Sequence, residues 1–384
     1  MKVRPEWFGA TVSLERPRAL VQVNRSMARL LGVAASPLWR GPDPGQLCAP
    51  TEVHVVVSKR CSAGCRSCYV DARPDGPALS LEQGKAVLSN LADLGVFHVA
   101  LGGGEALELD WLFELATHAR RVGLLPNLTT NGLDLTPRTA EQCRDFGQIN
   151  VSIDGVGEGY RQARGLDGFE RARRGLRLLR AVKREVGLNC VVSRSNFDRL
   201  GEVLAFAKSE KLSEVELLRL KPAGRALESW QDEALTPDQA RSLYPRVRWL
   251  ALRHRIRVKL DCSFAPLVFW HRPSLAACRF FGVVGCAGGD LLAAVHPDGS
   301  LTGCSFGGPV EASAFDPAAV RAALDVGFGW FRAFKAKAPE PCRSCRYLEL
   351  CNGGCRVVAQ ASGGDALTPD PGCPYVAGAA PGWA

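Results

Sequence analysis

Three cysteines stand within eight positions in the segment CSAGCRSCYV at residues 61–70. Cys61, Cys65 and Cys68 have the spacing C-x3-C-x2-C, an odd number of thiols for a structural zinc site, where four ligands are usual. Soft thiolates on one flexible loop suit an iron–sulfur cluster, and three of them on a four-iron cluster leave one iron open to another ligand. The segment therefore favours an iron–sulfur site, with zinc or three unrelated core cysteines as the alternatives.

The composition agrees with metal or redox chemistry. The 384 residues are 46% hydrophobic and include 15 cysteines. Residues 1–18 have charges and a proline where a signal peptide needs an apolar core, and apolar runs such as residues 264–270 are too short to span a bilayer. We therefore expect a cytoplasmic protein without a membrane partner, in which a reducing environment keeps thiols free for metal binding.

The charge pattern does not indicate a nucleic-acid partner. The formal net charge is +9, which is modest for this length. Its densest part, residues 171–185, has the apolar spacing of an amphipathic helix with a basic outer face. We interpret that face as solvated.

Short β-branched runs alternate with amphipathic stretches from residue 53 onwards. The predicted strands are residues 53–58, 97–102, 125–130, 149–154, 188–193 and 214–220. Six strand–helix units predict an α/β fold in which a parallel sheet curls into a partial (β/α)6 TIM-like barrel. Chemistry in such barrels collects at the carboxyl ends of the strands, which is where the cysteine segment and the segments 102–105 and 130–132 fall.

We predict four regions along the chain. Residues 1–50 form a short N-terminal extension of unknown role, and residues 51–235 form the barrel. Residues 236–277 form a bridging region with a long helix at about 236–254 and a strand at 256–260. Residues 278–384 form a second domain, in which cysteine, glycine and proline become frequent and regular periodicity fades.

The cysteine spacing after the first strand resembles the signature of the radical S-adenosylmethionine (SAM) superfamily. The resemblance implies that the amino and carboxylate groups of SAM bind the open iron. Reduction then cleaves SAM to a 5′-deoxyadenosyl radical that abstracts a substrate hydrogen, so the cofactor supplies the difficult chemistry. Two positions depart from the family: Ser67 stands where an aromatic residue is usual, with Tyr69 close by, and Ala106 replaces a proline.

The resemblance also implies SAM contacts at the strand ends. Candidates to hold the SAM ammonium are Gly103, Gly104 and Glu105, and candidates for contacts to its carboxylate and ribose are Asn131, Ser152 and Asp154. Each of these could instead cap a turn. Arg225, in KPAGRA, resembles an active-site cation of the family, and no other catalytic residue is assigned.

The C-terminal cysteines resemble the seven-cysteine SPASM domain, which binds two auxiliary four-iron clusters in a subset of radical SAM enzymes. The pattern is C-x12-G-x4-C from residue 286, then C-x2-C-x5-C-x3-C from residue 342, then a last cysteine. By this resemblance the outer cluster uses Cys342, Cys345, Cys351 and Cys373, and the inner cluster uses Cys286, Cys304 and Cys355. Cys278 is the candidate for a fourth inner ligand, and without it the inner cluster has an open iron.

Four cysteines lie outside these motifs. Cys48, Cys143, Cys190 and Cys262 are interpreted as ordinary buried residues. The segment C-x2-C-x5-C-x3-C taken alone could also bind zinc.

The resemblance implies a radical SAM oxidoreductase with SAM and three [4Fe–4S] clusters. We predict that it abstracts hydrogen from a residue of a precursor peptide, forming a crosslink or another modification in a ribosomally synthesised peptide. Its partners would be a reductase, flavodoxin or ferredoxin as electron donor, and either a separate leader-peptide recognition protein or the extension itself.

Three other functions stay open. The chain could modify a small molecule, oxidise a sulfatase as sulfatase maturases do, or serve as a non-catalytic iron–sulfur or zinc scaffold. Ser305 stands where sulfatase-maturing members carry an aspartate, which argues against the second.

Overall fold

The computed structural model describes residues 1–15, 18–182, 185–326 and 328–378. A ten-stranded sheet curves through most of the chain in the order β10-β9-β8-β7-β6-β5-β4-β11-β12-β13. The barrel strands, which are all parallel, are β4 (Glu52–Ser58), β5 (His98–Gly103), β6 (Leu125–Thr130), β7 (Ile149–Ser152), β8 (Val186–Val192), β9 (Glu214–Arg219) and β10 (Arg257–Leu260). The predicted α/β fold with a curved parallel sheet is confirmed, and the strand expected at 256–260 joins the sheet beside β9.

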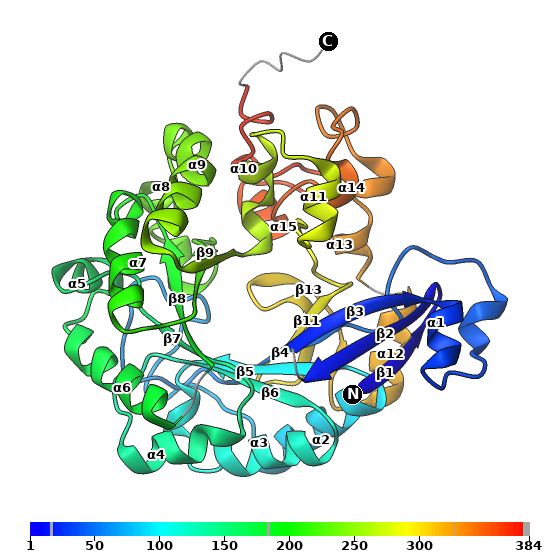
Figure 1. Ribbon diagram of the computed structural model, residues 1–384, viewed down its shortest axis with the longest axis horizontal. Helices are drawn as coiled ribbons and strands as arrows, with labels where there is room; N and C mark the ends of the chain where they lie inside the picture. The colour runs from blue at the N-terminus through cyan, green and yellow to red at the C-terminus, as the bar shows by residue number, and fades with distance from the viewer. Residues whose placement is uncertain (16–17, 183–184, 327, 379–384) are drawn as a thin grey trace.

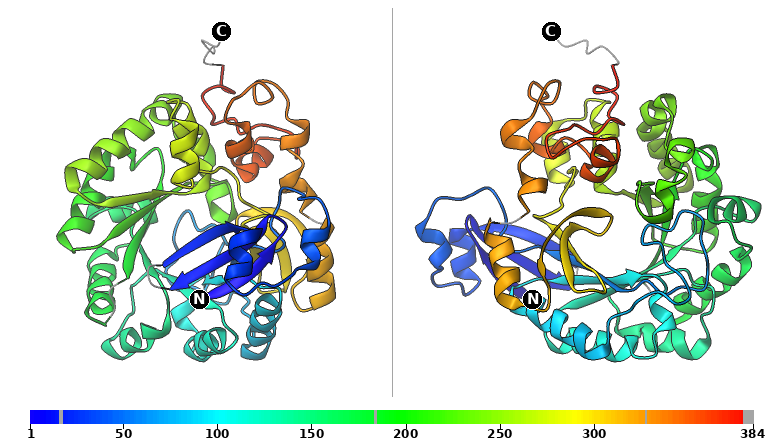
Figure 2. Two further views of the ribbon diagram at one scale, coloured as in Figure 1. Left: turned by 45° about the vertical axis from the view of Figure 1, so that its right-hand side comes forward. Right: turned by 180° about the vertical axis from the view of Figure 1, so that it is seen from behind.

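Helices cover the outer side of this curved sheet (Figures 1 and 2). They are α2 (Leu81–Asp93), α3 (Leu112–Arg121), α4 (Pro137–Gln142), α6 (Phe169–Val182), α7 (Leu200–Ser209) and α9 (Pro237–His254). The short helices α5 (Glu158–Arg164) and α8 (Trp230–Glu233) follow β7 and β9, and Arg164 and Glu233 at their ends line the barrel cavity. The helix α2 begins in a capping box, in which Ser80 Oγ accepts a hydrogen bond from the Gln83 amide (3.1 Å) and Gln83 Oε1 accepts one from the Ser80 amide (2.8 Å). Such local signals fix where the helices start.

The strand β4 shows how the core and the site share one element. Val53, Val55 and Val57 are at most 1% exposed and belong to the main apolar core. Glu52 and His54, at the alternate positions, line the interior of the barrel. Because side chains alternate along a strand, one face of β4 packs against helices while the other faces the cavity.

The cysteine-rich region continues the barrel sheet. Its strand β11 (Leu292–Val295) pairs in parallel with β4, and β12 (Ser300–Cys304) and β13 (Gly307–Ser313) extend the sheet in antiparallel order. The other helices of this half are α10 (Ala265–Phe269), α11 (Leu275–Phe280), α12 (Pro317–Val326), α13 (Gly329–Arg332), α14 (Leu348–Cys351) and α15 (Arg356–Ala361). The sheet therefore crosses the boundary expected at residue 278, and the division into domains stays a prediction.

The N-terminal extension forms its own antiparallel sheet, drawn in blue in Figure 1, followed by one short helix. The elements are β1 (Lys2–Glu6), β2 (Gly9–Glu15), β3 (Arg18–Asn24) and α1 (Arg25–Leu30). Arg4 fixes this sheet to the barrel, because its guanidinium donates to the carbonyl oxygens of Pro50 (2.8 Å) and Gly95 (3.2 Å). The edge strand β3 contributes Ala19 and Leu20 to the lining of the barrel cavity.

Among the described residues, no helix combines the length and the apolar character needed to cross a membrane.

Candidate active site

A cavity of about 1050 Å³ occupies the inside of the open barrel and the carboxyl ends of its strands. The predicted residues that line it are Cys61, Cys65, Cys68, Gly103, Gly104, Glu105, Asn131, Ser152 and Asp154. Arg225 is not among the lining residues. The structure thus brings together, in one cavity, residues that lie up to 93 positions apart in the chain, from Cys61 to Asp154.

The cysteine loop, residues 59–80, follows β4 and is held against the end of β5. The Gly104 amide donates to the Ser58 carbonyl (2.6 Å), and the Glu105 amide donates to the Arg60 carbonyl (2.8 Å). A Cβ atom on Gly104 would lie 2.0 Å from the Arg60 carbonyl oxygen, and Gly103 has a φ of 115°. The glycines are therefore required by the approach of the cysteine loop itself, in addition to any approach of a ligand.

Arg225 holds the same loop from its other side. Its Nε and one terminal nitrogen donate to the Cys65 carbonyl oxygen at 3.0 and 2.9 Å. The other terminal nitrogen donates to Asp71 Oδ1 (2.7 Å) and to the Ala72 carbonyl oxygen (2.8 Å). The structure places this cation behind the cysteines, where it positions the loop.

Arg164, in α5, is a site residue that the sequence did not suggest. Its guanidinium donates to Cys65 Sγ (3.3 Å), to Asp154 Oδ2 (3.0 Å) and to the Ser152 carbonyl oxygen (3.2 Å). Burial opposes its charge, but Asp154 and Cys65 outweigh that effect and raise the pKa of Arg164. Arg164 thus places a fixed positive charge beside the sulfur of Cys65.

Glu105 places a buried carboxylate at the cavity wall. It is 5% exposed and accepts hydrogen bonds from Thr130 Oγ1 (2.8 Å) and the Asn131 amide (2.7 Å). Burial raises its pKa to about 7, although these two hydrogen bonds oppose the rise. An ammonium group in the cavity would remove this penalty, so the environment of Glu105 suits the contact expected for SAM.

A hydrogen-bonded chain on the inner wall was also not foreseen. Ser305 Oγ lies 3.1 Å from His54 Nδ1, and His54 Nε2 lies 3.1 Å from Glu52 Oε1. Burial would raise the pKa of Glu52, but the hydrogen bond from His54 and the charges of His54 and His98 hold it near 2. In the sequence, this hydrogen-bonded chain is indicated only by the polar residues at alternate positions 52 and 54. That alternation does not indicate Ser305 as the third member.

Aromatic side chains connect the cysteine loop to the C-terminal region. The rings of Tyr69 and Phe306 lie 4.8 Å apart, and Lys221 Nζ lies 4.3 Å from the centre of the Phe306 ring. All three residues line the cavity, and so does Ser67. The aromatic surface beside the third cysteine therefore comes from Tyr69 and Phe306.

The four cysteines of the predicted outer set surround a second, smaller cavity. Cys342, Cys345, Cys351 and Cys373 line it together with apolar residues that include Phe269 and Tyr347. Burial and the neighbouring thiols raise the pKa of Cys342 to about 12 and that of Cys351 well above its usual value. Buried thiols of this kind ionise where a cation compensates their charge, so the set fits an iron–sulfur cluster.

The predicted inner set is also assembled. Cys304 interacts electrostatically with Cys286 and Cys355, and burial raises its pKa to about 12. Across the described parts of the chain, no three side chains of Cys, His, Asp or Glu converge on a point that could hold a single metal ion. Cysteines of an iron–sulfur cluster bind different irons and do not need to converge in that way.

The barrel matches a known family. Residues 55–207 match the radical SAM superfamily. Mycofactocin maturase MftC of Mycolicibacterium smegmatis is 28% identical over 327 residues, which cover 82% of this chain and 80% of that protein. PqqA peptide cyclase of Bradyrhizobium diazoefficiens is 29% identical over 340 residues, which cover 84% of this chain and 86% of that protein.

A third relative is named as a heme synthase and not as a peptide-modifying enzyme. AdoMet-dependent heme synthase of Methanosarcina barkeri is 28% identical over 353 residues, which cover 85% of this chain and 97% of that protein. Among solved structures, Streptococcus suis SuiB bound to its precursor peptide SuiA has a TM-score of 0.76 at 15% identity, with 97% of this chain and 98% of that chain covered. That likeness shows a shared fold over nearly the whole chain.

Proposed function

Since residues 55–207 of this chain match the radical SAM superfamily, we propose that it modifies a residue of a ribosomally synthesised precursor peptide, forming a crosslink or a related product. The observation that carries the proposal is the extent of the barrel cavity. It reaches from the cysteine loop, past the strand ends, to Leu20 on the edge strand β3 of the N-terminal sheet. A cavity that meets a free strand edge can receive an extended peptide, which pairs with such edges through its backbone.

The relatives support a peptide substrate. A maturase and a peptide cyclase match more than four fifths of the chain, so the similarity includes the region after the barrel. The match of the SuiB–SuiA complex extends to the N-terminal sheet as well, since it covers 97% of the chain.

The chain's own residues have separate tasks in this proposal. A [4Fe–4S] cluster with SAM supplies, when bound, the carbon radical that removes a hydrogen atom from the substrate. Cys61, Cys65 and Cys68 would hold that cluster, and Glu105 would orient the SAM ammonium. Arg164 and Arg225 keep the cysteine loop in place around it. The chain of Ser305, His54 and Glu52 could accept a proton released at the substrate.

We further propose two auxiliary [4Fe–4S] clusters in the C-terminal half. The outer one would use the four cysteines that line the smaller cavity, and the inner one would use Cys286, Cys304 and Cys355. Three clusters require about twelve irons per chain and an electron donor such as a flavodoxin, ferredoxin or reductase.

For leader recognition, the edge strand β3 favours the extension itself over a separate protein. Leu20 and Val21 are about 40% exposed on this strand, next to the cavity. We place the reaction in the cytoplasm, because free thiols persist in a reducing compartment.

A small-molecule substrate is the second candidate. The match to a heme synthase over 85% of the chain favours it, because the motifs of the barrel are shared by both kinds of enzyme. The two candidates differ in the substrate that is consumed. A sulfatase-like substrate is not favoured, because Ser305 provides a hydroxyl where a carboxylate base would be needed.

The test is anaerobic reconstitution with iron and sulfide, followed by incubation with SAM, dithionite and a precursor peptide encoded beside the gene. We expect about twelve irons per chain, formation of 5′-deoxyadenosine and a mass change in the peptide. In the triple variant Cys61→Ala, Cys65→Ala, Cys68→Ala, SAM cleavage should stop while about eight irons remain. Cys143→Ala, at a buried cysteine of the barrel core, is the control and should keep all three readouts.

Persistent SAM cleavage in the triple variant would exclude the proposed role of the cysteine loop. An unmodified peptide together with active SAM cleavage would favour the small-molecule candidate.

A further inference from the structure

One further cysteine, Cys262, lies near the predicted inner set, although its sequence position did not indicate this. Cys262 begins a short turn (Cys262–Phe264) directly after β10 and is partly buried, not fully buried as its sequence suggested. The turn is fixed on both sides, because the Asp261 amide donates to the Leu217 carbonyl (3.0 Å) and Asp261 Oδ1 accepts from the Ser263 amide (3.1 Å). The backbone therefore holds Cys262 at a defined place at the carboxyl end of the sheet.

The thiol of Cys262 is close enough to two thiols of the inner set for their charges to interact. It interacts electrostatically with Cys286 and Cys355, and Cys355 in turn interacts with Cys286. Cys304 interacts with the same two cysteines. Cys262 and Cys304 thus share both of their cysteine neighbours, which makes a group of four sulfurs contributed by four separate segments of the chain.

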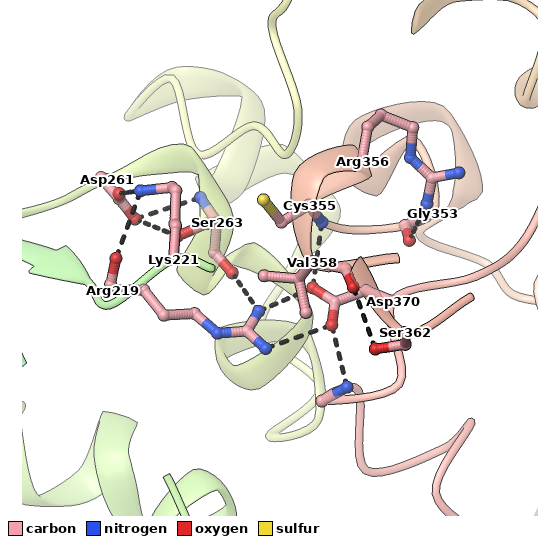
Figure 3. A network of polar contacts seen from close by, with 11 residues as sticks. Arg219, Lys221, Asp261, Ser263, Gly353, Cys355, Arg356, Val358, Ser362 and Asp370 are labelled. Carbon is pink, nitrogen blue, oxygen red and sulfur yellow. Dashed lines mark hydrogen bonds and ion pairs between the residues drawn. The ribbon is translucent and has the colours of Figure 1, made fainter. Parts of the chain in front are cut away.

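A buried lysine faces this group. Lys221 is 4% exposed, pairs with Asp261 and interacts electrostatically with Cys262, Cys304 and Cys355. Figure 3 shows Lys221 and Cys355 beside Asp261 and Ser263, the two residues that flank Cys262. A site with four thiolates carries more negative charge than its metal neutralises, so a buried lysine in this position stabilises it.

Cys278 lies in different surroundings. It is 3% exposed in α11 and packs in a small apolar cluster with Ala265, Phe269 and Tyr347. The cysteines that pack against that cluster are Cys345 and Cys351, both of the outer set, which already has four members. Its burial therefore has an apolar explanation that needs no metal.

We propose that Cys262, and not Cys278, is the fourth ligand of the inner auxiliary cluster. This assignment depends on the auxiliary clusters of the proposed function, and it names the fourth ligand of the inner one. With four cysteines the inner cluster has no open iron, so it passes electrons and does not bind the substrate.

The experiment uses the full chain in the background of the Cys61, Cys65 and Cys68 triple variant, so that only auxiliary clusters contribute. Cys262→Ala should lower the iron content from about eight toward about four, or leave a cluster that ferricyanide converts to a three-iron form, seen by electron paramagnetic resonance. Cys278→Ala and the control Cys143→Ala should leave both iron content and spectrum unchanged. Cys262→Ser, which keeps the volume and offers a weaker oxygen ligand, should fold normally by circular dichroism and show a shifted spectrum.

An unchanged spectrum in folded Cys262→Ser, or an effect of Cys278→Ala equal to or larger than that of Cys262→Ala, overturns the assignment. The pair Cys286→Ala, Cys304→Ala separates this failure from that of the proposed function. If that pair keeps about eight irons, the inner cluster does not exist, whatever the role of Cys262.

Discussion

At the scale of single residues, arginines decide how the cysteine loop is held. Arg164 approaches the sulfur of Cys65 from α5, and Arg225 binds the carbonyl oxygen of the same residue from the segment after β9. Both therefore fix a loop that has no regular secondary structure between residues 59 and 80. Arg225 was predicted as an active-site cation, and its contacts indicate a positioning role.

Arg225→Met should weaken the binding of the SAM cluster. The side chain is 21% exposed and makes four hydrogen bonds, each of a kind that contributes about 1.5–3 kcal/mol when a charge is involved. We expect the iron content after gel filtration to fall from about twelve toward about eight. Arg73→Met is the matched control, since Arg73 also pairs with Asp71 but is 66% exposed. Equal iron in the two variants would refute the role of Arg225.

At the scale of elements, the basic face of α6 is only partly the solvated surface that its sequence indicates. Arg173 and Arg177 reach Glu210, which follows the last residue of α7, at 2.8 and 2.7 Å. Glu210 is 6% exposed and stands at a helix C-terminus, where a negative charge is unfavourable. The two arginines compensate for it and join neighbouring helices of the barrel wall.

Glu210→Gln should lower the free energy of unfolding by about 1 kcal/mol at pH 7. The hydrogen bond from Arg177 is the main cause that lowers the pKa of Glu210. A lowered folded-state pKa means that the pair stabilises the fold above the usual glutamate pKa of about 4.3 and that this gain disappears as the pH falls through the folded value. Urea unfolding should therefore show a difference between the proteins at pH 7 that shrinks as the pH is lowered below about 4.3.

Glu202→Gln, which removes an exposed pair with Arg199 on α7, should cost less than about 0.5 kcal/mol at either pH. A difference for Glu210→Gln that stays constant with pH would contradict the ionic explanation.

At the scale of the whole molecule, the C-terminal region closes onto the barrel from both edges of the parallel part of its sheet. The strand β11 pairs with β4 at one edge, and Asp370 pairs with Arg219 of β9 near the other. Asp370 is fully buried and also accepts hydrogen bonds from the amides of Cys355 (2.9 Å) and Gly372 (2.8 Å), as Figure 3 shows for Cys355. The same carboxylate thus connects a barrel strand to the cysteine-rich segment.

Asp370→Asn should destabilise the protein by about 3–5 kcal/mol, because it leaves the buried Arg219 charge without its partner. The midpoint of thermal unfolding measures this loss, and the irons of the auxiliary clusters should be released earlier than in the parent protein. Asp93→Asn, at an exposed position at the end of α2, is the control. Unfolding midpoints that agree between Asp370→Asn and the control would show that the connection contributes little.

The sequence by itself determined the features that are local along the chain. The spacing of Cys61, Cys65 and Cys68 and the periodicity of the barrel elements depend only on neighbouring residues, so the chemistry type and the α/β fold could be predicted. The start of α2 could be predicted for the same reason, since the capping box between Ser80 and Gln83 spans only four residues. The assignment of single site residues to SAM and to the clusters stays a prediction.

Only the tertiary structure decided which distant residues meet. Arg164 reaches Cys65 across 99 positions, and Ser305 reaches His54 across 251, because closure of the barrel and addition of β11 bring those segments together. Cys262 had no recognisable spacing to Cys286, Cys304 and Cys355, and its place beside them follows from the packing of β10 against β9. Sequence spacing records contacts within a loop, whereas contacts between strand ends depend on the order of strands in the sheet, which no single segment encodes.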